Sequence, residues 1–186
     1  MKSKINLFEI IQKHNDTLKT SNGKLIPKDK NIFFITPLII GIVIITWAGA
    51  PSEKLLNLFT LCLSVFVGLF LNLLVLLLSF SKSTDQTKDL ANRKELVKQT
   101  FYNVNYTIII SLICLGILFL ANYDFIPGDY QIKPINIKGY CSPKISINKV
   151  ISNILYFVFY TLFTHLTLTL LMIIKRIYKL FNAEIE

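Results

Sequence analysis

Apolar and charged positions separate into long blocks along this chain. Four stretches contain no Asp, Glu, Lys or Arg: residues 31–51, 55–81, 100–123 and 150–174. A helix needs about 20 apolar residues to cross roughly 30 Å of hydrocarbon. The pattern therefore predicts an all-α integral membrane protein with four transmembrane helices, at about residues 32–50, 55–80, 104–121 and 150–174.

The polar segments between and beside the predicted spans indicate the structures outside the membrane. Residues 1–30 form an N-terminal segment with an amphipathic helix, in which Leu7, Ile11, His14 and Leu18 share one side. Such a helix is typical of an interfacial anchor, and the alternative is a docking site for a partner protein. The charged loop 81–100 is helical at its end, where span 3 can continue it. Residues 130–138 and 145–147 alternate apolar and polar positions, which predicts a β-hairpin in the small external loop 122–149, either a spacer or a ligand site. Residues 176–186 form a tail.

Basic residues set the orientation. Fifteen of the 20 Lys and Arg residues lie in the N-terminal segment, in the loop after span 2 or in the tail. The positive-inside rule then places both termini in the cytoplasm of a bacterial inner (plasma) membrane. The net charge of +9 is concentrated beside the spans, where basic residues bind lipid head groups. We therefore expect membrane lipids as partners and no direct nucleic-acid binding.

Span 2 carries a regular polar pattern. Small or polar residues recur at steps of seven, four, four and seven, which places them on one helical face: Asn57, Ser64, Gly68, Asn72 and Ser79. Small residues let helix backbones approach closely in a membrane, and an Asn amide can form a hydrogen bond between helices. Packing within the chain's own bundle is the first interpretation. A homo-oligomer interface or a pore lining is the second.

Span 4 contains a candidate intramembrane polar site. It has His165 in its apolar interior, surrounded by Thr161, Thr164 and Thr169. An ionisable side chain inside a membrane is a functional candidate by default. The alternative is a neutral His hydrogen-bonded to the Thr hydroxyls or to a facing Asn, with no further role. Span 3 has a related polar stripe at Asn103, Thr107, Ser111 and Cys114.

The chain lacks the residues that several classes of function require. No span contains a carboxylate or Lys for ion coupling, and the chain has no phosphate loop, HExxH motif or paired catalytic carboxylates. His14 and His165 have no metal-ligand companions at useful sequence intervals. We expect no enzymatic activity, no cofactor and no metal. Cys141 faces the outside in this topology, where it can form only an intermolecular disulfide.

Residues 63–78 (LSVFVGLFLNLLVLLL), followed by the charged segment 88–98, resemble small four-span membrane components of bacterial phage-defence systems, such as the Kiwa membrane subunit. This resemblance implies antiviral defence, through a self-associating membrane subunit or effector that works with a cytoplasmic protein partner. The alternatives are a channel-like pore or permeation protein, with Asn72 and His165 lining the path, and an envelope sensor or immunity protein that uses the external loop.

Overall fold

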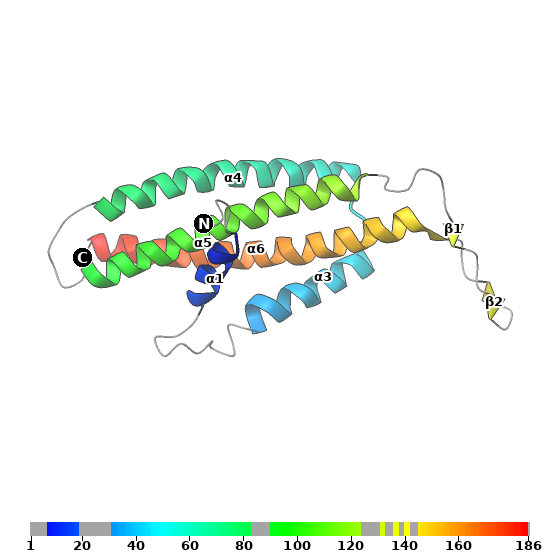
Figure 1. Ribbon diagram of the computed structural model, residues 1–186, viewed down its shortest axis with the longest axis horizontal. Helices are drawn as coiled ribbons and strands as arrows, with labels where there is room; N and C mark the ends of the chain where they lie inside the picture. The colour runs from blue at the N-terminus through cyan, green and yellow to red at the C-terminus, as the bar shows by residue number, and fades with distance from the viewer. Residues whose placement is uncertain are drawn as a thin grey trace, which may run out of the picture.

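The computed structural model describes residues 7–18, 31–82, 90–123, 131–132, 136–137, 140–141 and 145–185. Within these residues the protein is an all-helical bundle with a few two-residue strands. Three helices are long and apolar enough to cross a membrane: α4 (Glu53–Lys82), α5 (Leu90–Ala121) and α6 (Ile147–Ile185). They lie side by side, with α5 packed against both α4 and α6 (Figure 1).

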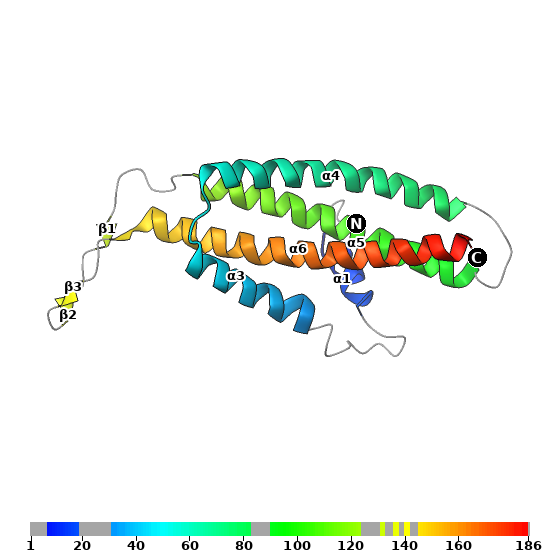
Figure 2. The same ribbon diagram turned by 180° about the vertical axis from the view of Figure 1, so that it is seen from behind.

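The first predicted span is shorter than expected. It consists of a π-helical turn, η1 (Asn31–Ile35), and α3 (Thr36–Trp47), which together cover 17 residues or about 25 Å of helix. Pro37 lies in the first turn of α3, where its missing N–H costs least. Helix α3 packs along the half of α6 nearest Ile147 (Figure 2).

Gly41 allows this close approach. A Cβ atom added to Gly41 would overlap Thr161 Oγ1 on α6, and it would lie only 3.3 Å from Thr161 Cβ. Only a residue without a side chain therefore fits at this crossing of α3 and α6.

Two apolar clusters form the core of the bundle. One contains Leu63, Cys114 and Phe159, and the other contains Phe70, Val104 and Ile173. Both join α4, α5 and α6, so the three long helices are held together along much of their length. The expectation that span 3 continues the charged helix before it is confirmed, because α5 begins at Leu90 and runs unbroken to Ala121.

Charged side chains gather at one end of the bundle. The last turns of α4 and α6 and the first turns of α5 meet there (Figure 1). Lys94, Glu95 and Lys98 of α5 lie at this end with Lys175, Arg176 and Lys179 of α6. We call it the basic end.

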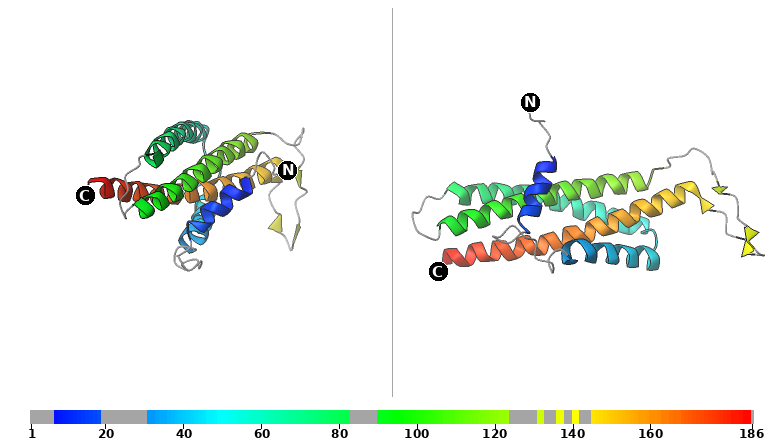
Figure 3. Two further views of the ribbon diagram at one scale, coloured as in Figure 1. Left: turned by 60° about the vertical axis from the view of Figure 1, so that its left-hand side comes forward. Right: turned by 60° about the horizontal axis from the view of Figure 1, so that its bottom comes forward.

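An amphipathic helix is present in the described part of the N-terminal segment, and it lies against the bundle. Helix α1 (Leu7–Asp16) packs on α5 and runs across the long helices rather than along them (Figure 3). His14 and Leu18 are buried, whereas Leu7 and Phe8 are 46% and 74% exposed. The apolar side is therefore divided between contact with α5 and an outer surface.

Short strands lie beyond the opposite end of the bundle. Strand β1 (Gln131–Ile132) pairs with β4 (Ile145–Ser146), and β2 (Asn136–Ile137) pairs with β3 (Tyr140–Cys141), both antiparallel. Each strand has two residues, and much of the predicted hairpin falls outside the described residues. The β-hairpin of the external loop stays a prediction.

Candidate functional site

Three helices that are distant in sequence meet at one polar cluster. Helix α1 contributes His14 and Thr17 follows its end, α5 contributes Asn103 and Tyr106, and α6 contributes His165. His14 is 1% exposed and Asn103 is fully buried. We call these five residues the polar junction. It brings together both His residues of the chain, whose rings lie 6.3 Å apart.

His14 is fixed by a hydrogen bond and a stacked ring. Its Nδ1 lies 2.8 Å from Asn103 Oδ1, and because an amide oxygen can only accept, Nδ1 carries the proton. The imidazole stacks on the Tyr106 ring at a centroid distance of 3.8 Å and an interplanar angle of 3°. Thr17 Oγ1 lies 2.9 Å from Asn103 Oδ1. These contacts attach α1 to the middle of α5.

The environment of His14 favours the neutral ring. Burial lowers the pKa of His14 to about 4, and nearby His165 and Arg176 add to the lowering. The hydrogen bond to Asn103 opposes this shift but does not offset it. Neutral His14 has its proton on Nδ1, so Nε2 presents a lone pair, and this atom is buried without a partner in the described chain.

His165 joins three elements. Its Nδ1 lies 2.8 Å from the Phe33 carbonyl oxygen of η1, and its Nε2 lies 2.9 Å from the Tyr106 hydroxyl of α5. The carbonyl can only accept, so Nδ1–H donates to it and Nε2 accepts from the hydroxyl. A single neutral tautomer therefore satisfies both nitrogens.

Pro37 lies four residues after Phe33 in the sequence. In an α-helix the Phe33 carbonyl would accept from the N–H of the residue four positions later, and that residue is Pro37, which has no N–H. A carbonyl left without a partner in a membrane interior is costly. His165 supplies a donor to the Phe33 carbonyl, so a helix-starting proline and a histidine from another span form one structural unit.

Arg176 connects the junction to the basic end. Its Nη2 donates to the Thr17 carbonyl at 3.0 Å, while its Nη1 and the Nδ2 of Asn103 are buried without partners among the described residues. The described chain contains no group of three or more His, Cys, Asp or Glu side chains placed to hold a metal ion. The junction is suited to hold helices together through neutral hydrogen bonds.

The threonines of span 4 do not bond to the His165 side chain. The hydroxyls of Thr161, Thr164 and Thr169 each donate to the carbonyl four residues earlier on α6, as is common for Thr in helices. The expected partners of His165, Thr hydroxyls or a facing Asn, are thus replaced by Tyr106 and the Phe33 carbonyl. Thr169 is fully buried, and Thr161 faces Gly41.

The polar face of span 2 points away from the bundle. Its members are all exposed: Asn57, Ser64, Gly68, Asn72 and Ser79. Nothing lies within 4 Å of a Cβ placed on Gly68, and the Ser64 and Ser79 hydroxyls bond only to carbonyls of their own helix. We call these five residues the α4 polar face. Packing inside the chain's own bundle does not account for it.

The polar stripe of span 3 has the opposite orientation. Asn103, Thr107, Ser111 and Cys114 are all buried, with exposed fractions of 0–1%. Two similar sequence patterns therefore face in opposite directions, one into the bundle and one outward.

No family model, curated protein or solved structure matches this chain. The resemblance to phage-defence membrane components accordingly stays a prediction.

Tyr106 and Phe33 were not identified from the sequence as parts of the site. The available signals were the position of Tyr106 one turn after Asn103, and that of Pro37 four residues after Phe33. Neither signal indicates which distant side chain completes the contact.

Proposed function

We propose that the protein is a self-associating membrane subunit and that the α4 polar face is its association surface. The observation that carries this proposal is the outward exposure of that face. Asn72 is a polar residue in a strongly apolar helix, and its side chain makes no hydrogen bond within the described chain. In hydrocarbon an amide side chain gains from a partner on another helix, by about 0.6–2 kcal/mol.

The shape of the face supports a helix as its partner. The buried residues of α4, Leu63, Phe70 and Leu77, recur every seven positions on the opposite side of the helix. Ser64 and Gly68 form a small-x-x-x-small pair that lets a second backbone approach. A second copy in the same orientation would place two α4 helices side by side and bring the Asn72 amides within reach of each other.

The proposed topology has four spans. Three of them are α4, α5 and α6, and the fourth is the shorter segment Asn31–Trp47, which is apolar throughout. A span shorter than the hydrocarbon is accommodated by local thinning of the bilayer at modest cost. The basic end then faces the cytoplasm of a bacterial inner membrane, following the positive-inside rule.

The proposed role is that of a membrane effector that a cytoplasmic protein partner recruits or triggers, within a defence system against phage. The resemblance of residues 63–78 and 88–98 supports the defence context. The exposed Leu7 and Phe8 of α1 offer an apolar contact on the same side of the membrane as the charged ends of α5 and α6. The hydrogen bonds of the polar junction hold α1, α5, α6 and η1 together, and we propose this structural role for it rather than a catalytic one.

Gly68→Leu tests the association surface. The added side chain would separate packed α4 helices, so we expect the oligomer to dissociate, as measured by mass photometry in lipid nanodiscs. Gly116→Leu is the matched control, because Gly116 is also an exposed glycine in a membrane helix with nothing within 4 Å of an added Cβ. Equal oligomer size in the wild type and Gly68→Leu would assign the α4 polar face to lipid.

A pore is the second candidate, and the exposure of Asn72 favours only one form of it. Asn72 lies on the outer side of α4, whereas His165 is buried among η1, α5 and α6, so one path lined by both is not supported. Several copies arranged around a shared axis could instead line a pore with their α4 polar faces. Conductance of reconstituted liposomes that is lost in Asn72→Leu would favour this pore.

The sensor function of the external loop concerns residues that lie mostly outside the described chain.

A further inference from the structure

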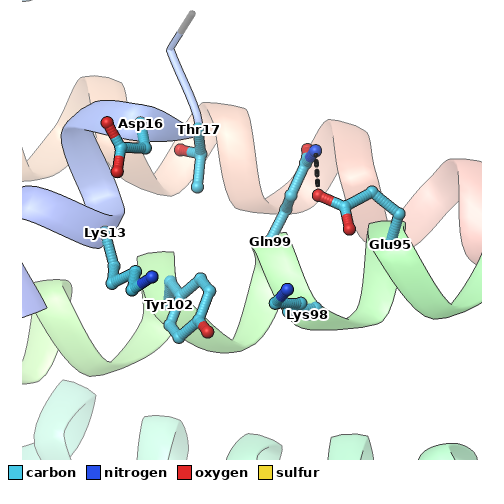
Figure 4. Close-up of a pocket in the computed structure, with 7 residues that line it drawn as sticks. All are labelled: Lys13, Asp16, Thr17, Glu95, Lys98, Gln99 and Tyr102. Carbon is cyan, nitrogen blue, oxygen red and sulfur yellow. Dashed lines mark hydrogen bonds between the residues drawn. The ribbon is translucent and has the colours of Figure 1, made fainter. Parts of the chain in front are cut away.

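A small cavity lies between α1 and α5 at the basic end of the bundle. Its volume is about 140 Å³, enough for several water molecules and hence for a small polar group. Figure 4 shows α1 and the residue after it on one side and α5 on the other, with the lining residues drawn as sticks: Lys13, Asp16, Thr17, Glu95, Lys98, Gln99 and Tyr102.

The depth of the cavity matches the head-group layer. Lys98 is the last charged residue of α5 before the charge-free stretch that begins at Thr100, and Tyr102 lies just inside that stretch. Tyr is enriched at the membrane interface, where its ring is apolar and its hydroxyl is wet. Helix α1 crosses the long helices near this level (Figure 3), so in the topology proposed above the cavity lies close to the lipid head groups.

The charges of the cavity are balanced. Lys13 and Lys98 supply two positive charges, and Asp16 and Glu95 supply two negative charges. A purely anionic ligand would face the two carboxylates, and a purely cationic ligand would face the two ammonium groups. A zwitterion with a phosphate and a primary amine, separated by a short linker, is complementary to both.

The carboxylate of Glu95 has capacity for a ligand. One of its oxygens, Oε1, accepts from Gln99 Nε2 at 3.0 Å, and a carboxylate has further lone pairs on its other oxygen. Ammonium N–H groups form charge-assisted hydrogen bonds to such an oxygen, whereas a quaternary ammonium has no N–H to donate. The site can thus distinguish an ethanolamine from a choline head group.

We propose that this cavity binds the phosphoethanolamine group of a phospholipid, with the phosphate at Lys13 and Lys98 and the ammonium at Glu95. A bound head group would link α1 to α5 across the cavity and hold α1 against the bundle. This proposal does not depend on self-association through α4, because the cavity lies within one chain. If the cavity does not bind this head group, the proposal of self-association through the α4 polar face still stands.

The test compares lipids in nanodiscs by hydrogen exchange of the α1 amides. We expect greater protection with phosphatidylethanolamine than with phosphatidylcholine or phosphatidylglycerol. Glu95→Gln removes one charged hydrogen bond to the ethanolamine group. The concentration of phosphatidylethanolamine needed for the same protection of α1 should therefore rise about tenfold. Lys13→Gln should raise it similarly. Glu53→Gln, an exposed carboxylate at the opposite end of α4, should leave it unchanged.

Soluble phosphoethanolamine, added to nanodiscs of phosphatidylcholine, separates the two sources of the ligand. If the soluble compound protects α1 and the lipid does not, the site takes a metabolite and the lipid assignment is overturned. Equal protection in all three lipids, or a full ethanolamine effect in Glu95→Gln, would overturn the site itself. All four charged side chains are exposed, so their substitution leaves the core intact.

Discussion

His165 forms hydrogen bonds to two neighbouring elements, η1 and α5. The Phe33 carbonyl of η1 accepts from Nδ1 of the ring, and the Tyr106 hydroxyl of α5 donates to Nε2. The ring satisfies both through one neutral tautomer. The charge-free stretches identify His165 as unusual, but its role as a connector depends on residues 59 and 132 positions away in the chain, which no local pattern indicates.

Acid should release α1 through His14. The pKa of His14 is lowered from 6.5 to about 4 when α1 is packed, so the unpacked helix binds more protons between these values. Packing is therefore most favourable above pH 6.5 and weakens as the pH falls toward 4. Between pH 7.5 and pH 5 the loss is about 2 kcal/mol. Protection factors of the α1 amides from hydrogen exchange should fall accordingly.

His14→Phe isolates this effect. The variant keeps a ring on Tyr106 but has no titrating group at position 14, so the acid-dependent loss of protection should largely disappear. The other ionisable groups around the junction, His165, Arg176 and Glu95, are unchanged in the variant. An equal fall in protection in the wild type and His14→Phe would place the titrating group elsewhere.

At the scale of elements, contact between α3 and α6 depends on Gly41. Gly41→Ala introduces a Cβ that overlaps Thr161 Oγ1, and overpacking of this kind costs about 1–3 kcal/mol. We expect a lower midpoint of thermal unfolding in detergent or nanodiscs. Gly116→Ala is the control, since a Cβ there meets nothing within 4 Å and Ala favours helix over Gly.

A second substitution tests the cause. Thr161→Ala removes the Oγ1 atom that the new methyl group would meet, so Gly41→Ala combined with Thr161→Ala should recover most of the lost stability. If the double variant is as unstable as Gly41→Ala alone, the cost lies in the α3 backbone rather than at this crossing.

The positions of the helices could be predicted from the sequence much better than which side of each helix faces the bundle. The charge-free stretches gave helices α4, α5 and α6, and the periodicity at Leu7 to Leu18 gave α1. The polar stripes of spans 2 and 3 were equally visible, yet Gly68 and Asn72 are exposed while Asn103 and Thr107 are buried. In a membrane protein both the core and the lipid-facing surface are apolar, so hydrophobicity does not distinguish the inner side of a helix from the outer side.

At the scale of the whole molecule, the crossing of the membrane by α3 decides the topology. Helices α4, α5 and α6 are long and apolar enough to cross a membrane, and three crossings alone would leave the two termini on opposite sides. The segment Asn31–Trp47 adds a fourth crossing only if about 25 Å of helix spans a bilayer of roughly 30 Å. Packing of α3 against α6 and an apolar sequence favour insertion.

Reporters fused at the two ends of the chain distinguish these topologies. With four spans, a reporter before Met1 and one after Glu186 should both be active in their cytoplasmic form and inactive in their periplasmic form. A third reporter, fused after Ser52 between α3 and α4, should be active only in its periplasmic form. Because fifteen of the 20 basic residues lie in segments that four spans place on one side, the positive-inside rule predicts this result. Termini on opposite sides would instead show that α3 enters the bilayer without crossing it, and the N-terminal segment would then lie on the periplasmic side.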